Sequence, residues 1–279
     1  TLSRSSAASD VYKRQGASYT PTQTVSGVKN SLLFLICLIP LSLGFIIPVS
    51  ILLNFVIKGY SIINFLEIFQ ITLSSISLAF ISSSFIMLLS LLMIIVGAYK
   101  SNNFQKILIF FASSGYAFPG TILAVGIVVF VGWLNDLIYF RMSYAVGGFI
   151  ILLFAYSIRF LAVGNGAITS GISRIHPNLL DASRTMGVSF FKSIRKIILP
   201  LLYTNLLVGG ILVFVDILKE LPITLLLRPF NFETLATYVY QYASDEMLEE
   251  SAFAALIIVI AGLGPVIFLN RTITKSIKN

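Results

Sequence analysis

Residues 181–200 read DASRTMGVSFFKSIRKIILP, a polar and basic stretch inside a chain that is otherwise mostly apolar. Of the 279 residues, 57% are hydrophobic and 11% are charged, whereas soluble domains carry about 25% charged residues. A globular core cannot use so much apolar surface, but a bilayer can. A β-barrel would show alternating segments of about ten residues, and this chain has long unbroken apolar runs instead. The composition therefore predicts an all-α polytopic membrane protein.

Six apolar segments are each long enough to cross a bilayer, which takes about 20 residues. The third contains GYAFPG at Gly115–Gly120, where Pro119 and Gly120 are expected to break the helix because proline removes a backbone donor. The break is either a tolerated kink or a bend that lines a pathway, since broken helices at membrane depth lie beside cavities. The predicted spans are about 32–57, 68–99, 107–133, 144–163, 198–218 and 252–269.

The charged residues separate onto two sides of these spans. If the N-terminus is cytoplasmic, Arg159 lies near the inner end of the fourth span, and the acidic residues gather on the outer side. Cytoplasmic loops carry an excess of Lys and Arg, so both termini of this segment and the 165–200 loop are predicted to be cytoplasmic. The net charge of +8 then reflects orientation in the membrane rather than nucleic-acid binding. The inner basic residues are Lys29, Lys100, Lys106, Arg174, Arg184, Lys192, Arg195, Lys196, Arg271, Lys275 and Lys278.

The first 15 residues, TLSRSSAASDVYKRQ, are polar and begin with Thr1. They lack the apolar core of a signal peptide, and we expect a non-native leader here, on a chain that is a fragment. We expect a cytoplasmic linker at 16–30 and a six-span domain at 31–279.

The 165–200 loop has the sequence features of two short helices. Pro177 can begin a helix, with Asn178 as its N-cap and Asp181 three residues further on. Gly187 is expected to end that helix, because glycine accepts the left-handed conformation of a C-cap. Ser189 can cap a second helix, with apolar and basic residues on opposite faces. The apolar face is Phe190, Ile194, Ile197 and Ile198, and the basic face is Lys192, Arg195 and Lys196.

An interfacial helix bound by anionic lipid would explain the basic face, but not the spacing around it. The spacing resembles the EAA signature of permease subunits of binding-protein-dependent ABC importers, which reads E-A-A, three residues, G, nine residues, I-x-L-P. Here Asp181-Ala182-Ser183 is followed after three residues by Gly187, and Ile197 to Pro200 follows after nine more. Asp replaces Glu, and Ser replaces the second Ala. The resemblance implies the type I ABC importer permease fold, with a cytoplasmic coupling helix.

The resemblance also implies partners and residue roles. The loop would dock into a groove on a separate ATPase dimer, which holds ATP and Mg, while a periplasmic binding protein delivers the substrate at the inner membrane. A second permease half, fused or separate, would complete the pathway. Asp181 would cap or pair at the docking helix, Ala182 and Ser183 would allow close approach, Gly187 would set the turn, and Arg184 would pair with an acidic groove. The chain has no GxxxxGK[ST] phosphate loop, so we expect no catalytic residue and no cofactor of its own.

Two further stretches, Gly115–Gly126 and Lys219–Phe230 with Thr234–Thr237 after it, resemble the C-terminal half of fused iron(III) importer permeases. Thiamine, sulfate, molybdate and polyamine permeases are relatives with similar motifs and remain alternatives. A secondary transporter driven by an ion gradient would need ionisable residues deep in its spans, and the predicted spans contain almost none. A membrane enzyme would need a nucleophile with its base, or a metal cluster, and neither is evident.

Glu220 and Pro222 follow the fifth span. An ionisable group at membrane depth usually faces a cavity, and Pro222 ends the helix and frees backbone groups. We predict that both belong to an outer gate or translocation path, together with Pro119 and Gly120. The alternative is an ordinary helix end with a Lys219–Glu220 salt pair.

Other polar residues give weaker signals. Tyr238, Tyr240 and Tyr242 alternate near the outer side and are typical of an interfacial aromatic belt, although a phenolate is also a hard donor for iron. With one cysteine, Cys37, and one histidine, His176, a structural metal site is not expected.

Overall fold

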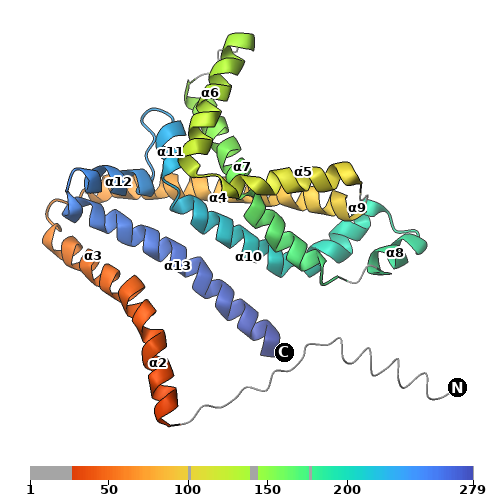
Figure 1. Ribbon diagram of the computed structural model, residues 1–279, viewed down its shortest axis with the longest axis horizontal. Helices are drawn as coiled ribbons and strands as arrows, with labels where there is room; N and C mark the ends of the chain where they lie inside the picture. The colour runs from red at the N-terminus through yellow and green to blue at the C-terminus, as the bar shows by residue number, and fades with distance from the viewer. Residues whose placement is uncertain (1–26, 100–101, 139–143, 176–177, 279) are drawn as a thin grey trace. The chain divides into compact units, whose positions relative to one another are not determined.

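The computed structural model describes residues 27–99, 102–138, 144–175 and 178–278, and all the regular elements in these ranges are helices (Figure 1). The predicted leader, most of the linker, His176 and Pro177 lie outside them. The chain divides into two compact units, Thr1–Ser50 and Ile51–Asn279, which are described separately.

The first unit holds most of the first predicted span. Helix α2 (Val28–Leu41), a π-helical turn η1 (Ser42–Ile46) and the start of α3 (Ile47–Lys58) follow one another without interruption. Pro48 lies in the first turn of α3, and the carbonyl four residues before it, that of Gly44, lies in the π-turn, as expected where a missing amide disturbs the helical ladder. The run Lys29–Lys58 is apolar enough to cross a membrane, and none of its described side chains is buried.

Three long helices form the core of the second unit: α4 (Phe65–Tyr99), α7 (Tyr144–Ile172) and α10 (Leu199–Leu218). Small residues lie where they cross, as in other membrane bundles. A Cβ on Gly209 would lie 2.7 Å from the Ala167 Cβ, and one on Gly164 would overlap the Ser90 hydroxyl. The Asn205 amide donates to the Ala167 carbonyl oxygen at 3.1 Å, which adds a polar bond to this crossing.

The contacts also give the direction of each core helix. Gly171 faces Leu202 and Arg159 pairs with Glu220, so α7 and α10 run antiparallel. Residues 73–82 of α4 lie beside 149–153 of α7, and Ser90 lies beside Gly164, so α4 and α7 run in the same sense. The chain between them must therefore return across the bundle, which makes that segment the third crossing.

This return segment is broken, as the sequence predicted. Helix α5 (Asn103–Ser114) passes through a 3-10 turn η2 (Gly115–Ala117), the chain is extended at Phe118, and α6 (Gly120–Ile138) starts after Pro119. The two halves are bent by 117°, and Figure 1 shows α6 leaving the line of α5.

The remaining helices of the second unit follow in chain order. They are α8 (Asn178–Thr185), α9 (Phe190–Ser193) with a π-helical turn η3 (Ile194–Ile198), α11 (Pro222–Leu227), α12 (Leu235–Ser244) and α13 (Leu248–Lys278). The described residues thus contain five helices able to span a membrane, and a sixth span if the bent pair counts as one. The prediction of an all-α polytopic protein is confirmed.

One predicted boundary was wrong, with a consequence for the site. The fourth span was expected to end near Val163, but α7 continues to Ile172. Small and polar residues such as Gly164, Asn165 and Gly166 made this last part look like a loop. Because α7 continues, Arg159 lies about halfway along it and not near its inner end.

Candidate functional site

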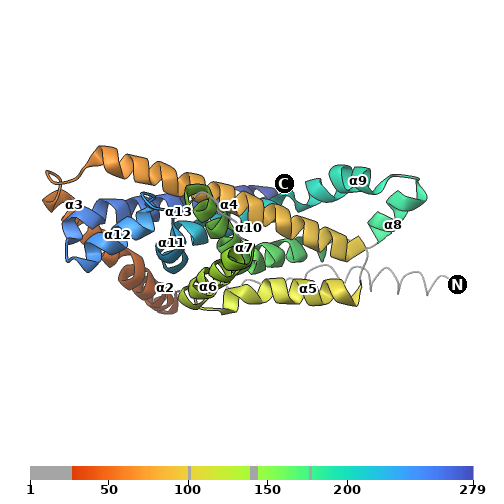
Figure 2. The ribbon, with the colours of Figure 1, turned by 90° about the horizontal axis from the view of Figure 1, so that it is seen from above.

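The EAA-like loop forms two helical arms, which project from the end of the bundle at which α10 begins (Figures 1 and 2). The first arm is α8, and the second is α9, which continues through η3 into α10. Pro200 lies near the start of α10, inside this continuous helical run, and the carbonyl four residues before it, that of Lys196, lies in the π-helical turn η3, as expected where a missing amide disturbs the helical ladder. The predicted second helix is therefore the beginning of the fifth span and not a separate surface helix.

Gly187 ends the first arm, as expected. Its φ is +74°, in the left-handed region that costs other residues roughly 1–2 kcal/mol. The Val188 amide donates to the Ser183 carbonyl oxygen at 3.0 Å, a bond characteristic of a glycine C-cap. Nothing lies within 4 Å of a Cβ built on Gly187, so backbone conformation and not lack of space requires glycine here.

Ser183 joins the two arms. Its hydroxyl lies 3.0 Å from the Ser193 hydroxyl, and the two residues are 0% and 1% exposed. The close approach that a small residue permits at position 183 is thus between α8 and α9. Ala182, the neighbouring small residue, is exposed.

The two faces of the second arm differ as predicted except at Phe190, which was expected on the apolar face and is 38% exposed. Ile198 is buried and Ile194 half-buried, whereas Lys192, Arg195 and Lys196 are exposed. Ser189 lies at the predicted N-cap of α9, but its side chain makes no capping bond. Apolar side chains at the tip of the arms are also exposed: Met186 at 72% and Phe191 at 83%.

Asp181 and Arg184 lie on α8, and their side chains are outside the described part of the chain. Their predicted roles, in capping and in pairing with an acidic groove, stay predictions.

A second site lies at the break in the third span. The Arg159 Nε is 3.4 Å from Glu220 Oε2, and Arg159 Nη1 donates to the Phe118 carbonyl oxygen at 3.3 Å. The side chains are 20% and 7% exposed, so this is an ion pair largely removed from solvent. It connects the middle of α7, the break before α6 and the chain just after α10. We call Phe118, Gly120, Arg159, Glu220 and Thr224 together the break cluster.

Gly120 allows the pair to form. A Cβ at this position would lie 2.6 Å from Arg159 Nη1 and 2.9 Å from Glu220 Oε1. Any larger residue would have to displace the guanidinium or the carboxylate. The predicted gate residues Gly120 and Glu220 are therefore brought together, with Arg159 between the two helices.

Thr224 completes the cluster from α11, the short helix that Pro222 begins. The Thr224 hydroxyl donates to the Glu220 carbonyl oxygen at 2.6 Å. The Tyr156 hydroxyl lies 2.5 Å from the Thr224 hydroxyl. Tyr156 is 0% exposed and lies one turn before Arg159 on α7. This arrangement fixes the turn between α10 and α11 against α7.

The expected Lys219–Glu220 pair is not what the structure shows. Lys219 pairs with Asp216 at 2.9 Å, one turn back on the same surface, while Glu220 turns inward. Sequence reasoning missed Arg159 as the partner of Glu220, because the early end assigned to the fourth span placed it elsewhere. The available signal was the pair itself, since two opposite charges within a long apolar region must find partners.

A further set of polar contacts stabilises the connection between α11 and α12. Arg228 Nη1 lies 2.5 Å from Glu233 Oε1 and donates to the Phe232 carbonyl oxygen at 3.2 Å. Thr234 caps α12 in a reciprocal capping box with Thr237. The Thr234–Thr237 stretch thus has a structural role that its spacing alone did not show.

The tyrosines of α12 differ from one another. Tyr238 is 5% exposed and its ring lies 4.4 Å from that of Tyr242, while Tyr240 is 47% exposed. Burial, followed by the hydrogen bond with Tyr242, raises the pKa of the Tyr238 phenol. The aromatic-belt interpretation was therefore wrong for Tyr238, and its phenol stays protonated at neutral pH.

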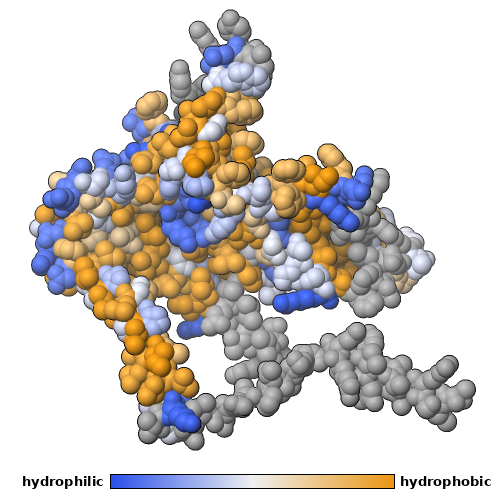
Figure 3. All heavy atoms as spheres, viewed as in Figure 1, coloured by the Kyte–Doolittle hydropathy of each residue, from blue (hydrophilic) through white to orange (hydrophobic). Residues whose placement is uncertain are grey.

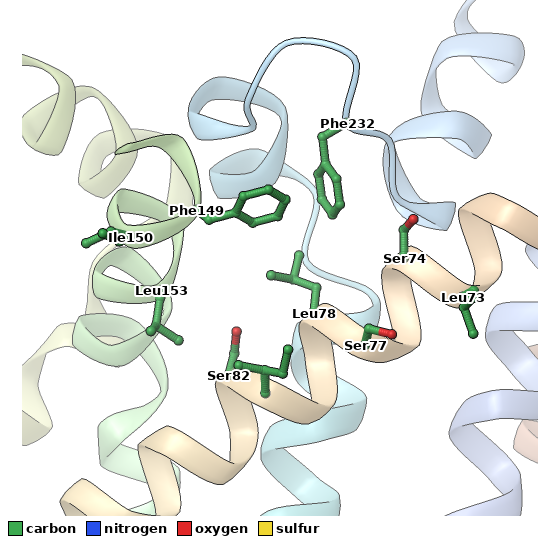
Figure 4. A pocket seen from close by; sticks show the side chains of 10 residues that line it. Leu73, Ser74, Ser77, Leu78, Ser82, Phe149, Ile150, Leu153 and Phe232 are labelled. Atoms are coloured by element: carbon green, nitrogen blue, oxygen red, sulfur yellow. The ribbon is translucent and has the colours of Figure 1, made fainter. Parts of the chain in front are cut away.

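A cavity of about 500 Å³ lies between α4, α7 and the connection before α12 (Figure 4). Its lining is apolar apart from three serines of α4: Ser74, Ser77 and Ser82. Phe149 and Phe232 pack edge to face at one side of it, with ring centroids 4.7 Å apart. No charged side chain lines the cavity, and the described residues contain no group of three His, Cys, Asp or Glu able to hold a metal ion.

Comparison with known proteins gives the family. Residues 90–279, which include both sites, match the family described as "binding-protein-dependent transport system inner membrane component". The chain belongs to this family. Its members are transport components of the membrane, in agreement with the apolar helices described above.

Individual relatives are more distant. The chain is 25% identical over 157 residues to the "Fe(3+)-transport system permease protein FbpB 2" of Haemophilus influenzae, an alignment that covers 56% of this chain and 29% of that protein. The chain thus corresponds to less than a third of this relative's length.

Solved structures confirm the fold of an ABC transporter permease. A chain of a bacterial ABC transporter involved in the import of the acidic polysaccharide alginate superposes with a TM-score of 0.65 at 16% identity, over 88% of this chain and 96% of that one. A chain of an inward-facing MetNI methionine ABC transporter superposes with a TM-score of 0.52 at 14% identity, over 73% of this chain and 95% of that one.

Proposed function

We propose that this chain is a permease subunit of a binding-protein-dependent ABC importer, and that the EAA-like loop docks on a separate ATPase. The family match supports the first part. The second part rests mainly on the two projecting arms, which present Met186 and Phe191 at the tip, where a partner surface could bury them. Scattered exposed apolar residues are ordinary, but here they adjoin the exposed basic face of the loop.

In this proposal, the ATPase dimer binds and hydrolyses ATP with Mg, and the permease converts the movement into a change of access. Gly187 sets the angle between the arms, and the Ser183–Ser193 bond keeps them together. Asp181, Ala182 and Arg184 lie on the arm that contacts the ATPase, and Pro200 lies in the helix that carries the movement from the loop into the membrane. A second permease half, fused or separate, and a periplasmic binding protein complete the importer.

The orientation belongs to the same proposal. The loop must face the compartment that contains the ATPase, which places it and both ends of this segment in the cytoplasm. The exposed Lys192, Arg195 and Lys196 support this, because basic residues accumulate on the cytoplasmic side. The exposed apolar side chains of α5 and α6, orange in Figure 3, would then face lipid or the second permease half.

For the substrate we propose iron(III). The support is the resemblance of Gly115–Gly126 and Lys219–Phe230 to iron permeases, together with the iron-transport relative. Thiamine, sulfate or molybdate, and polyamine remain the alternatives. A secondary transporter would have to use the Arg159–Glu220 pair as its ionisable site. Uptake that requires the ATPase would exclude a secondary transporter.

The test uses the full-length protein, co-expressed with its partner ATPase and reconstituted in nanodiscs. ATP hydrolysis is measured with binding protein that carries iron(III), thiamine or nothing. Stimulation by the iron form alone is the expected result. Stimulation by another form would keep the importer and replace its substrate, and absence of any ATPase association would refute the proposed function.

A further inference from the structure

The EAA-like loop and the break cluster lie at opposite ends of one helical rod. From Phe190 to Leu218 the chain is helical without interruption through α9, η3 and α10, and these 29 residues are apolar enough to span a membrane. The loop lies at the start of the rod, and Glu220 lies two residues beyond its end. A displacement of the loop along or around this rod therefore reaches Glu220.

Helix α6 has few other attachments within this chain. Of its described residues, Gly120, Ala124 and Ile127 are buried and form a single stripe at helical spacing. The opposite side is exposed, for example Val125 at 55% and Val129 at 66%. The start of α6 is held where Arg159 bonds the Phe118 carbonyl and Gly120 faces the ion pair. Its position thus depends on the break cluster and on the adjoining α11.

We propose that the Arg159–Glu220 ion pair is a latch that makes the start of α6 move together with the end of the α9–α10 rod. Arg159 is a positioning residue in this latch, because its planar guanidinium contacts two partners at once: it forms an ion pair with the Glu220 carboxylate, whose Oε2 lies 3.4 Å from Nε, and it donates a hydrogen bond from Nη1 to the Phe118 carbonyl oxygen. The latch rests on the proposed function, since the rod is moved by an ATPase, but it adds the route by which that movement reaches the broken span.

A latch can be distinguished from an ion pair that serves only stability. Removing one partner of a buried pair leaves an uncompensated charge and is strongly destabilising, whereas replacing both partners with neutral side chains is often tolerated. If the pair only stabilises the fold, Arg159→Met with Glu220→Gln should restore both assembly and coupling. If the pair is a latch, the double variant should assemble but should not couple.

The experiment places spin labels on cysteines introduced at Val129 of α6 and Tyr203 of α10, both exposed, in a Cys37→Ser background. The labelled protein is reconstituted with its ATPase, and the distance distribution is measured without nucleotide and after trapping with ATP and vanadate. The wild type should keep one narrow distribution in both states. In the double variant, the distance distribution should be broader without nucleotide and should shift on trapping. Its uptake per ATP should fall by about tenfold, within the usual range of coupling between sites.

The matched control is Asp216→Asn, which removes the carboxylate that pairs with Lys219 one turn earlier, where the two side chains are 20% and 64% exposed. It should behave as the wild type in every measurement. A double variant with the wild-type distances in both states would overturn the latch, and so would one that never reaches the membrane, since the pair would then be a folding element. If the wild type binds no ATPase, the proposed function fails. The width of the distance distribution without nucleotide, compared between the wild type and the double variant, still tests the latch.

Discussion

The EAA-like loop and the break cluster represent two different ways of building a functional site. The loop is local: its residues lie within 20 positions in sequence, most of its described side chains are exposed, and one glycine and one serine pair determine its geometry. The break cluster is assembled from three distant parts of the chain around residues 118–120, 159 and 220–224. Its charges are removed from solvent and connect helices that the sequence separates by about 40 to 60 residues.

This difference explains what the sequence could reveal about each site. A local site leaves its spacing in the sequence, and glycine, proline and small residues at fixed distances were enough to find the loop. A site that depends on tertiary contacts leaves only isolated clues. Glu220 and the break were recognised as clues, but their common partner Arg159 was not.

The largest effect is expected at Gly115, where the break meets α7. A Cβ there would overlap the backbone carbonyl of Ile158, and backbone cannot move aside as a side chain can. Gly115→Ala should abolish uptake and lower the amount of folded protein, because overpacking of a tight contact costs roughly 1–3 kcal/mol or more. Gly166→Ala on α7, with nothing within 4 Å, is the control. Normal yield and uptake by the Gly115 variant would show that the break is looser than described.

Gly187→Val should abolish uptake while the spans stay inserted. Valine is β-branched and strongly disfavoured at a φ of +74°, so the turn between the arms must change. Gly187→Asn is the matched control, because asparagine adopts this conformation more readily and should keep much of the activity. Uptake and co-purification of the ATPase are the measurements. Normal transport by the valine variant would refute the docking role of the loop.

Gly120→Ala should reduce uptake without loss of insertion. The added methyl would meet the Arg159 guanidinium at 2.6 Å, and a side-chain end can move aside at the expense of the ion pair. Gly126→Ala on the same helix places its methyl group where nothing lies within 4 Å, and uptake should be unchanged. The comparison of uptake per ATP in the two variants separates the cluster from a general intolerance of α6. Equal values would remove Gly120 from the site.

The smallest effect is expected at Ser183. Ser183→Ala loses a buried hydrogen bond to Ser193, worth about 1 kcal/mol, but keeps the small volume that the EAA signature has at this position. Uptake should fall by less than about tenfold, the factor for 1.4 kcal/mol. Ser183→Leu should be far worse, because residue 183 is 0% exposed and the arms would separate. If the two variants behave alike, the arms are not held together at this point.

Much of the fold was predictable from composition and periodicity. Long apolar runs need only a count of residues to be recognised, and Pro119 followed by Gly120 was enough to indicate the break in the third span. The end of the fourth span was predicted wrongly because Gly164, Asn165 and Gly166 look like loop residues. In the structure two of them contact other helices: Gly164 meets Ser90, and Asn165 donates to the Ser113 hydroxyl at 3.1 Å. Only tertiary packing distinguishes these two uses of small and polar residues.

The most direct test of the account is contact between the EAA-like loop and the ATPase. Met186, 72% exposed at the tip of the first arm, is replaced by the photoreactive p-benzoylphenylalanine in the full-length protein, with the same replacement at Tyr203 on α10 as the control. Illumination in membranes should cross-link the Met186 position to the ATPase and leave the Tyr203 position unlinked to it. A transport-competent complex in which the Met186 position never links to the ATPase would contradict the central claim that this loop couples ATP hydrolysis to transport.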